Sequence, residues 1–452
     1  MATLVLLAGS FAAQSASAAP TVPKFEHVWI IALENENADV TFGPTSPATY
    51  LSMKLPQRGV FVPNYYATGH LSLDNYISMV SGQAPNPQTQ ADCPFFTDFA
   101  PGTPTSDGQV IGSGCVYPAS VETIADQLET AGLSWKAYMQ DMAASAPAAP
   151  SSCRHPAIGA QDDTQSAEVG DQYATRHNPF MYFHSVIDDV ASCDANDVDF
   201  DQMAIDLTRR KTTAAYNFIT PDLCNDGHDE PCINGDPGGL VQADSFLRTT
   251  LHSIFKSRAY HHRGLVIVTF DEAEATGGSA DTTACCNEQP GPNTPNPGGP
   301  SPGPGGGRVG AVMVSPCIRH ATTSNADYNH YSMLRSIEDN FGLPHLGFAG
   351  QSGLAGFGTD ILSRHDCHET IHLNRLFLAA RVDRIRDYRF RVRSRYPRCT
   401  SGVKIRYGGK HAITNRAGYA TIRNANAAAG PVAIATKQRC TSDRVTPPSA
   451  IA

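Results

Sequence analysis

Apolar runs with the length of β-strands recur along most of the chain. They cover residues 27–33, 59–62, 134–138, 216–219, 265–270 and 309–315. Helical signals lie between them. One is the segment 120–131, where Ser120 is a candidate N-cap and Gly132 a helix-ending glycine. Strands that alternate with helices predict an α/β fold with a mostly parallel sheet flanked by helices.

The pattern changes after residue 372. Apolar and polar residues alternate at 388–392, 403–407 and 432–434, and turn sequences lie at 408–409 and 415–418. This alternation predicts a small C-terminal β-sandwich. The hairpin segment 403–422 also resembles bacterial immunoglobulin-like modules. We therefore expect a large domain over residues 24–372 and a small immunoglobulin-like β-module over 373–446.

Two further segments carry distinct signals. Residues 1–18 are small and apolar and end in Ala-Ser-Ala, which predicts a signal peptide, although no Lys or Arg precedes the apolar stretch. No later apolar run reaches the roughly 20 residues of a membrane helix. Residues 288–307 are rich in Pro and Gly, which predicts a long mobile loop over one edge of the sheet.

The chain has 12 cysteines, an even number. Together with an export signal, this number favours disulfides and a secreted, extracellular protein over a metal cluster. We expect pairs 93–115, 224–232 and 399–440. The adjacent Cys285 and Cys286 are expected to bond to different partners.

The charge is divided unevenly. Residues 373–444 hold 17 Lys and Arg against 3 Asp and Glu, a net charge of +14, whereas the remainder holds 17 basic and 40 acidic residues, a net charge of −23. Such a division suggests modules with different partners. Either the basic module binds an anionic cell-surface polymer or lipid, or it docks on its own acidic partner domain. We expect no nucleic-acid binding.

Acidic and amide residues follow three of the predicted strands. Glu34 and Asn35 end the first, Asp271 and Glu272 end the fifth, and the run 222–229 follows the fourth. Ligands bind at the carboxyl ends of strands in open α/β sheets, and hard divalent cations prefer oxygen ligands. A lone acid at a strand end is usually a solvated loop residue, but three such ends favour a metal site.

Ser72 opens a predicted helix. The apolar residues Leu73, Tyr76, Ile77 and Val80 that follow it have helical spacing. Ser72 is either a plain N-cap or a nucleophile whose hydroxyl lies on a metal, with free N–H groups of the helix near phosphate oxygens. Both interpretations predict the same local geometry.

Five ordered motifs resemble the bacterial phosphoesterase family. They are VWIIALEN (28–35), GHLSLDNY (69–76), FITPDLCNDGHD (218–229), VTFDE (268–272) and YNHYSMLRSIEDNFGLP (328–344). This family groups secreted acid phosphatases with non-specific phospholipases C, and its fold is similar to that of alkaline phosphatase and the sulfatases. The resemblance covers residues 24–346.

The resemblance implies roles for individual residues. The metal ligands would be Glu34, Asn35, Asp271 and Glu272, and the ion a divalent one: calcium, magnesium or zinc. Ser72 would be the nucleophile, with His228 and His330 as acid–base groups. Substrate-binding positions would be His70, Asn75, Asp222 and His177. His330 precedes a predicted helix, so a capping or packing role is an alternative for it.

The motifs also depart from the family pattern. The sequence His70-Leu-Ser-Leu-Asp74 lacks both prolines of the usual motif, and the aromatic segment that follows Asp-Glu in the phospholipase C branch is absent. We therefore expect a secreted, metal-assisted phosphomonoesterase of the acid phosphatase type that acts through a serine phospho-enzyme. Its substrate would be a small phosphate ester or a lipid headgroup. The alternatives are a phospholipase C-like phosphodiesterase, a phosphoinositide phosphatase, and a non-enzymatic calcium-holding surface-binding protein.

Overall fold

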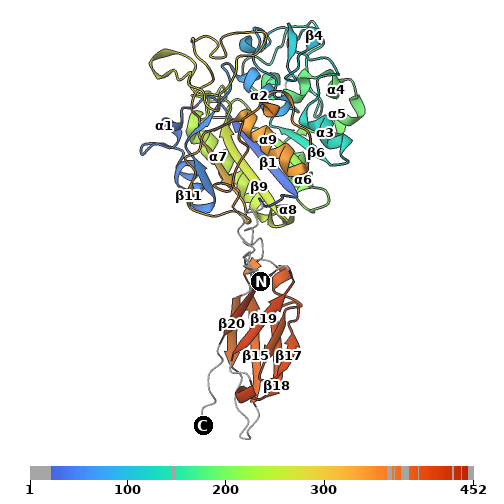
Figure 1. Cartoon of the computed structure of the whole chain (residues 1–452), viewed down its shortest axis with the longest axis vertical. Helices are drawn as coiled ribbons and strands as arrows, with labels where there is room; N and C mark the ends of the chain where they lie inside the picture. The colour runs from blue at the N-terminus through green and yellow to red at the C-terminus, as the bar shows by residue number, and fades with distance from the viewer. Residues whose placement is uncertain are drawn as a thin grey trace, which may run out of the picture.

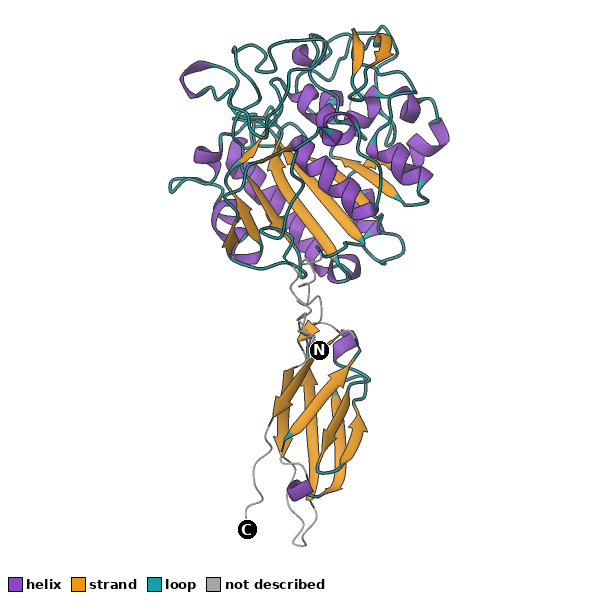
Figure 2. Cartoon of the chain, in the orientation of Figure 1, coloured by secondary structure: helices purple, strands orange, loops and turns teal. Residues whose placement is uncertain are grey.

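The computed structural model describes residues 22–144, 149–363, 369–370, 372–377, 386–394, 397–429, 432–438 and 440–445. The predicted signal peptide, residues 1–18, lies outside the described residues. The chain forms a larger part with strands and helices and a smaller part built almost entirely of strands (Figure 1, Figure 2). No described helix is both long and apolar enough to cross a membrane.

The larger part is built on an eight-stranded sheet in the order β11-β2-β10-β9-β1-β8-β6-β7. Its strands are β1 (His27–Leu33), β2 (Val60–Val62), β6 (Trp135–Met139), β7 (Asp197–Asp199), β8 (Tyr216–Thr220), β9 (Gly264–Phe270), β10 (Ala311–Val314) and β11 (Thr322–Thr323). All six apolar runs form strands, which confirms the mostly parallel α/β fold. The two-stranded additions are β3 (Tyr65–Tyr66) with β12 (Tyr328–Asn329), and β4 (Ala100–Pro104) with β5 (Val110–Ser113).

Strand β10 runs antiparallel to its neighbours β9 and β2, whereas the other pairings in this sheet are parallel. Two strands can pair in parallel only if a crossover returns the chain to the end of the sheet where the first strand began. Between β9 and β10 the chain forms no α-helix, only the 3₁₀ turn Gly277–Ser279. It re-enters the sheet at the end where β9 finishes, so β10 runs in the opposite direction to β9.

The α-helices are α1 (Ala38–Thr41), α2 (Ser72–Ser81), α3 (Ile124–Thr130), α4 (His184–Ile187), α5 (Val190–Asn196), α6 (Gln202–Asp206), α7 (Gly239–Lys256), α8 (Arg258–His261) and α9 (His330–Phe341). The expectation of an N-cap at Ser120 is wrong. The α3 cap is Thr123, whose side chain accepts from the N–H groups of Ala125 and Asp126, while the Asp126 carboxylate accepts from Thr123 N. This capping box satisfies unpaired N–H groups at the N-terminus of α3, and the cap lies three residues after the predicted one.

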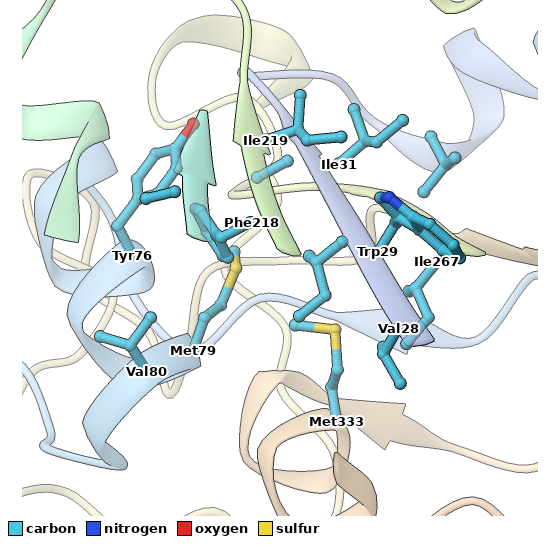
Figure 3. Packing of buried hydrophobic residues seen from close by; sticks show 14 of the residues in the cluster. Val28, Trp29, Ile31, Tyr76, Met79, Val80, Phe218, Ile219, Ile267 and Met333 are labelled. Atoms are coloured by element: carbon cyan, nitrogen blue, oxygen red, sulfur yellow. The ribbon is translucent and has the colours of Figure 1, made fainter. Parts of the chain in front are cut away.

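Burial of one face fixes α2 against the sheet. Tyr76, Met79 and Val80 are each 0% exposed, and Figure 3 shows Tyr76 and Met79 next to Phe218 of β8. Each such side chain contributes about 1.5–3 kcal/mol when it is fully buried. Packing of this face therefore determines where the first residue of α2 lies.

The smaller part consists of two sheets. The five-stranded sheet has the order β13-β20-β19-β16-β17, and the three-stranded sheet is β14-β15-β18. Their bounds are β13 (Glu369–Thr370), β14 (His372–Phe377), β15 (Arg386–Arg393), β16 (Lys404–Tyr407), β17 (Lys410–Ile413), β18 (Tyr419–Ala425), β19 (Ala433–Lys437) and β20 (Cys440–Val445). Residues such as Phe390 and Ile405 form a hydrophobic cluster separate from that of the larger part. The predicted boundary at residue 373 falls within β14; the domain limits and the immunoglobulin-like relationship stay predictions.

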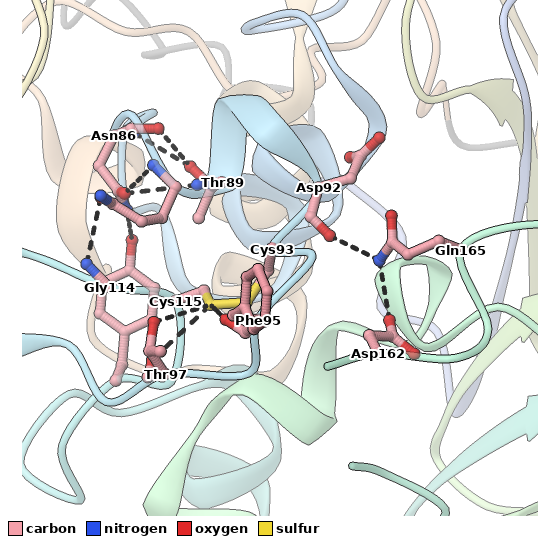
Figure 4. The surroundings of a disulfide bond; sticks show 12 residues. Asn86, Thr89, Asp92, Cys93, Phe95, Thr97, Gly114, Cys115, Asp162 and Gln165 are labelled. Carbon is pink, nitrogen blue, oxygen red and sulfur yellow. Dashed lines mark hydrogen bonds between the residues drawn. A yellow bond between two sulfur atoms is a disulfide. The ribbon is translucent and has the colours of Figure 1, made fainter. Parts of the chain in front are cut away.

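The predicted disulfides Cys93–Cys115 (Figure 4), Cys224–Cys232 and Cys399–Cys440 are present, together with Cys153–Cys193. The expectation for the adjacent pair is wrong, because Cys285 bonds to Cys286. Their Cα atoms are only 3.8 Å apart, and the left-handed backbone of Cys286 (φ 64°) turns the chain at this point.

Candidate functional site

The carboxyl ends of β1, β8 and β9 meet at one edge of the sheet. Glu34 N donates to Asp226 O at 2.9 Å, and Asp271 N donates to Leu33 O at 2.8 Å. Glu34, Asp226 and Asp271 are each 0–1% exposed. Parallel pairing of these strands therefore brings three carboxyl groups from distant parts of the sequence into one buried region.

Asp271 organises the turn after β1. Its Oδ1 accepts from Asn35 N at 3.0 Å and from Glu272 N at 2.6 Å. Asn35 has a left-handed backbone (φ 44°), which asparagine tolerates better than most residues. Asp271 Oδ2 and Asn35 Oδ1 are buried and have no hydrogen-bond partner among the described residues.

Ser72 is the first residue of α2, and its hydroxyl faces the strand ends. Ser72 Oγ donates to Glu34 Oε2 at 2.8 Å. The N-cap is Leu71, and no side chain of the cap residue bonds to the helix. The N–H of Leu73 instead donates to Asp92 Oδ1 at 3.0 Å. The capping interpretation of Ser72 is thus not what the structure shows, because its oxygen bonds to Glu34 rather than to its own helix.

His70 lies in the turn before α2 and contacts the second carboxylate after β9. Its Nδ1 bonds to Glu272 Oε2, and its Nε2 lies 2.9 Å from Asp281 O. Asn75 holds this turn from within α2: its Oδ1 accepts from Thr68 N and Gly69 N, and its Nδ2 donates to Gly69 O. Asn75 therefore stabilises the conformation of the turn that carries His70.

The Pro/Gly-rich loop packs against the same turn. His70 N donates to Pro297 O at 3.2 Å, and Ala67 N donates to Gly307 O at 2.9 Å. A Cβ atom on Gly306 would lie 1.9 Å from Gly69 O, so only glycine fits there. The loop forms part of the wall beside His70, next to the carboxyl ends of the strands.

His177 lies between two carboxyl groups. Its Nε2 is 3.1 Å from Glu34 Oε1 and its Nδ1 is 3.8 Å from Asp226 Oδ2. The ring stacks on Tyr76 of α2, with centroids 5.3 Å apart. Burial lowers the pKa of His177 well below its usual value, and the charge of the adjacent Arg176 lowers it further. The imidazole is therefore neutral and able to serve as a ligand or a hydrogen-bond acceptor.

His330 opens α9, and both of its ring nitrogens are engaged. Nδ1 lies 3.2 Å from Tyr65 Oη, and Nε2 lies 2.5 Å from Asp271 O. Burial lowers the pKa of His330 to about 4. This histidine connects α9 to the backbone of Asp271, a contact suited to positioning that carboxylate.

Two predicted residues lie apart from this network. The His228 side chain is 51% exposed, and its nearest charged partner is Asp229 at 3.9 Å. Asp222 Oδ1 accepts from Cys224 N and Asn225 N and so closes a tight turn after β8. Asp226, which the sequence interpretation passed over, is the acid of this run that reaches the site. The run 222–229 holds three acids, and only the path of the turn determines which of them reaches the site.

Negative charge accumulates in the site. Burial raises the pKa values of the Glu34, Asp226, Asp271 and Glu272 carboxyl groups well above their usual range. The charge of a neighbouring carboxylate raises each of them further: Asp271 acts on Glu34, and Glu34 acts on Asp226. Buried carboxylates without a compensating cation are costly, so the region favours a bound positive charge.

The donor set fits a hard divalent cation. Glu34 Oε1, Asn35 Oδ1, Asp226 Oδ2 and Asp271 Oδ2 are buried oxygens without a hydrogen-bond partner among the described residues. Across all the described residues, no group of three or more His, Cys, Asp or Glu side chains forms a preformed metal cluster. The four unpartnered oxygens are the kind of donor that a hard divalent cation prefers.

The profile of the phosphoesterase family matches residues 45–344, about two thirds of the chain, and the chain belongs to that family. A phosphate-repressible acid phosphatase of Penicillium chrysogenum is 27% identical over 327 residues, 72% of this chain and 60% of that protein. A phosphatidylinositol-3-phosphatase of Mycobacterium tuberculosis is 22% identical over 356 residues, 77% of this chain and 90% of the relative.

The chain thus spans about 60% of the length of the fungal acid phosphatase. Among solved structures, a protein of the alkaline phosphatase superfamily from Vibrio parahaemolyticus is similar, with a TM-score of 0.44 and 13% identity. The similarity covers 88% of this chain and 81% of that one.

Proposed function

We propose that the chain is a secreted phosphomonoesterase that uses Ser72 as its nucleophile. One observation carries the proposal: the Ser72 hydroxyl, at the first residue of α2, donates to the buried Glu34 carboxyl group at 2.8 Å. A nucleophile held against a proton acceptor is the arrangement that covalent catalysis needs. Membership of the phosphoesterase family supports a phosphate ester as the substrate.

In the proposed reaction, Ser72 Oγ attacks phosphorus and its proton passes to Glu34. The phosphorus–oxygen bond of the ester breaks, and the alcohol leaves with a proton. Water then hydrolyses the phosphoserine and regenerates the hydroxyl. Since Leu73 N is already bound by Asp92, phosphate binding at the N-terminus of α2 would fall to the other backbone N–H groups of its first turn.

Glu34, Asn35, Asp271 and Glu272 would hold a divalent metal ion, and the unpartnered oxygens of three of them support this assignment. Such an ion supplies positive charge against phosphoryl oxygens and favours the deprotonated form of a serine hydroxyl. The protein groups set its surroundings: His330 fixes the Asp271 backbone, and His70 contacts Glu272.

His228 is the group we assign to protonation of the leaving alcohol. Its side chain is exposed in the loop after β8 and is therefore open to proton exchange, whereas both nitrogens of His330 are occupied. His177 lies beside the Glu34 oxygen that Ser72 does not contact, with Nε2 3.1 Å from Oε1. His70, Asn75 and Asp222 shape the surrounding turns, and their direct contact with substrate stays a prediction.

The relatives favour phosphate monoesters. The relative from Penicillium chrysogenum is an acid phosphatase, and the mycobacterial relative is a phosphatidylinositol-3-phosphatase, so a phosphoinositide monoester is the second candidate substrate. The disulfides of the chain support an extracellular location, because such bonds persist in oxidising compartments.

The test is hydrolysis of p-nitrophenyl phosphate by the purified protein, with bis-p-nitrophenyl phosphate and a short-chain phosphatidylinositol 3-phosphate assayed in parallel. Preference for the monoester over the diester supports the proposal. A preference for the diester would favour a phospholipase C-like activity. Calcium binding without hydrolysis of any ester would favour the non-enzymatic surface-binding alternative.

A further inference from the structure

The outer face of the five-stranded sheet of the smaller part is basic. On β16, Ile405 and Tyr407 are buried inside, so Lys404 and Arg406 point outward. The pairing of β17, β16, β19 and β20 then aligns the outward residues of these four strands in rows. One cross-strand row consists of His411, Arg406, Ile434 and Arg444, and the next of Ile413, Lys404 and Thr436. We refer to these two rows as the basic face.

Among the described side chains of β16, β17, β19 and β20, no acidic residue neutralises this face. Strands β16, β17 and β19 contain no Asp or Glu. Asp443 of β20 lies opposite the buried Ala435, which puts it on the inner side of the sheet. Among the described residues, no ion pair involves Lys404, Arg406 or Arg444. Their positive charge is available to an external partner.

The same face exposes large apolar side chains. Ile413 is 64% exposed and Val432 is 38% exposed, and they are the large hydrophobic residues exposed in the described portion of the smaller part. Ile413 lies directly opposite Lys404. Val432 lines an open hollow of about 420 Å³ whose walls also include Lys404, Arg406 and His411. Cations and exposed aliphatic side chains are thus mixed on one surface.

We infer that the basic face docks the protein on a bilayer that contains anionic phospholipids. Lys404, Arg406 and Arg444 meet the headgroup phosphates, and Ile413 enters the interfacial layer between headgroups and acyl chains. A soluble or wall-bound polyanion would use the charges alone and gain nothing from an exposed isoleucine. The combination of both features favours a lipid surface, and this inference does not depend on the proposed catalysis.

The opposite sheet provides a matched control. Arg389 and Arg391 of β15 lie over the Tyr419 ring, at 4.6 and 5.2 Å from its centroid. Arg393 and Arg423 are exposed on that sheet. The three-stranded sheet therefore carries comparable positive charge. Among its described residues, no large hydrophobic side chain is exposed. Removing equal charge from either sheet separates a docking face from a general attraction.

The experiment is co-sedimentation of the full-length protein with vesicles of roughly 3:1 phosphatidylcholine to phosphatidylglycerol, and with phosphatidylcholine alone. Near-UV circular dichroism verifies the fold of each variant. We expect binding to the anionic vesicles that weakens as salt rises, because exposed charges are screened beyond about 8 Å at physiological ionic strength. Lys404→Glu with Arg406→Glu should weaken it by at least about 25-fold, given roughly fivefold per cation.

Arg393→Glu with Arg423→Glu changes the net charge equally and should leave vesicle binding within about threefold of the parent value. Ile413→Ser should weaken vesicle binding about fivefold while leaving retention on a heparin column unchanged. If charge reversal unfolds the sandwich, Lys404→Ala with Arg406→Ala replaces it.

Three results would overturn the inference. Absence of vesicle binding at low salt removes the docking surface. Equal losses from the two charge-reversal pairs indicate attraction by net charge, without a specific face. Loss of heparin retention alongside an unaltered vesicle affinity in the Ile413 variant points to a polyanion as the partner.

Discussion

Replacement of Ser72 by alanine separates a nucleophile from a structural serine. Ser72 Oγ makes one hydrogen bond, to Glu34 Oε2 at 2.8 Å, and caps nothing in its own helix. Its loss removes about 1–1.5 kcal/mol of hydrogen bonding, and the better helix propensity of alanine returns about 0.5 kcal/mol. Stability should therefore fall by about 0.5–1 kcal/mol, a shift in Tm of about 1 °C for a domain of this size.

The loss of catalytic activity in Ser72→Ala should be much larger than its loss of stability. Without the attacking oxygen, hydrolysis of p-nitrophenyl phosphate should fall by roughly 10⁴-fold or more, equivalent to about 5.4 kcal/mol in the barrier. Acid quenching of the wild-type protein during turnover should yield phosphate on the tryptic peptide that contains Ser72, and the alanine variant should yield none. Glu34→Gln keeps an acceptor for the hydroxyl but cannot take up its proton, so it should reduce turnover by a similar order.

Two controls complete the test. Ser81 lies at the other end of α2, is buried, and donates to Ile77 O at 2.7 Å, so Ser81→Ala costs similar stability without touching the site. Its activity should remain near that of the parent. The double variant Ser72→Ala with Glu34→Gln should be no slower than the slower single variant, because the two groups act in one step. Retention of more than about a tenth of the activity by Ser72→Ala would refute the reasoning.

Three further substitutions probe the site and the fold. Exhaustive chelation, or Asp271→Asn, should reduce turnover by orders of magnitude, and elemental analysis should find a divalent metal in the active protein; full activity in a metal-free sample contradicts the assignment. Asp226→Asn should lower activity or metal affinity about 10–100-fold because it disturbs the contact with His177, and unchanged kinetics would make that contact incidental. Burial raises the pKa of Glu338 to about 8 from 4.5, so the folded protein keeps a proton that the unfolded chain releases, and wild-type stability should fall as pH rises from 4.5 to 8. Glu338→Gln retains the acceptor for Leu346 N and should gain stability over the wild type across that range, by up to about 1.4 kcal/mol per pH unit; parallel urea-midpoint curves would exclude this account.

The strands of the main sheet could be predicted because burial on both faces requires continuous apolar sequence, as in residues 27–33. The direction of β10 could not, since it depends on the path of the long connection after Phe270 rather than on any local pattern. The C-terminal strands could be predicted from strict alternation, because only their inner residues, such as Phe390, reach the core.

Part of the candidate site was accessible from sequence for the same reason. Glu34 and Asp271 directly follow strands, so the sheet determines their position. Asp226 follows β8 at a distance, beyond a turn closed by Asp222, and no periodicity reports how such a turn folds. The contact between His177 and Glu34 joins residues far apart in the chain and becomes visible only in three dimensions.

The attachment of Ser72 to a helix buried in the main core has a consequence for heat inactivation. The face of α2 formed by Tyr76, Met79 and Val80 lies in that core, so Ser72 cannot move away from Glu34 unless the core opens (Figure 3). Residual activity on heating should therefore remain high and then vanish together with the calorimetric transition of the larger part. Because the two hydrophobic clusters share no residue, melting of the C-terminal sandwich should form a separate transition through which catalysis continues.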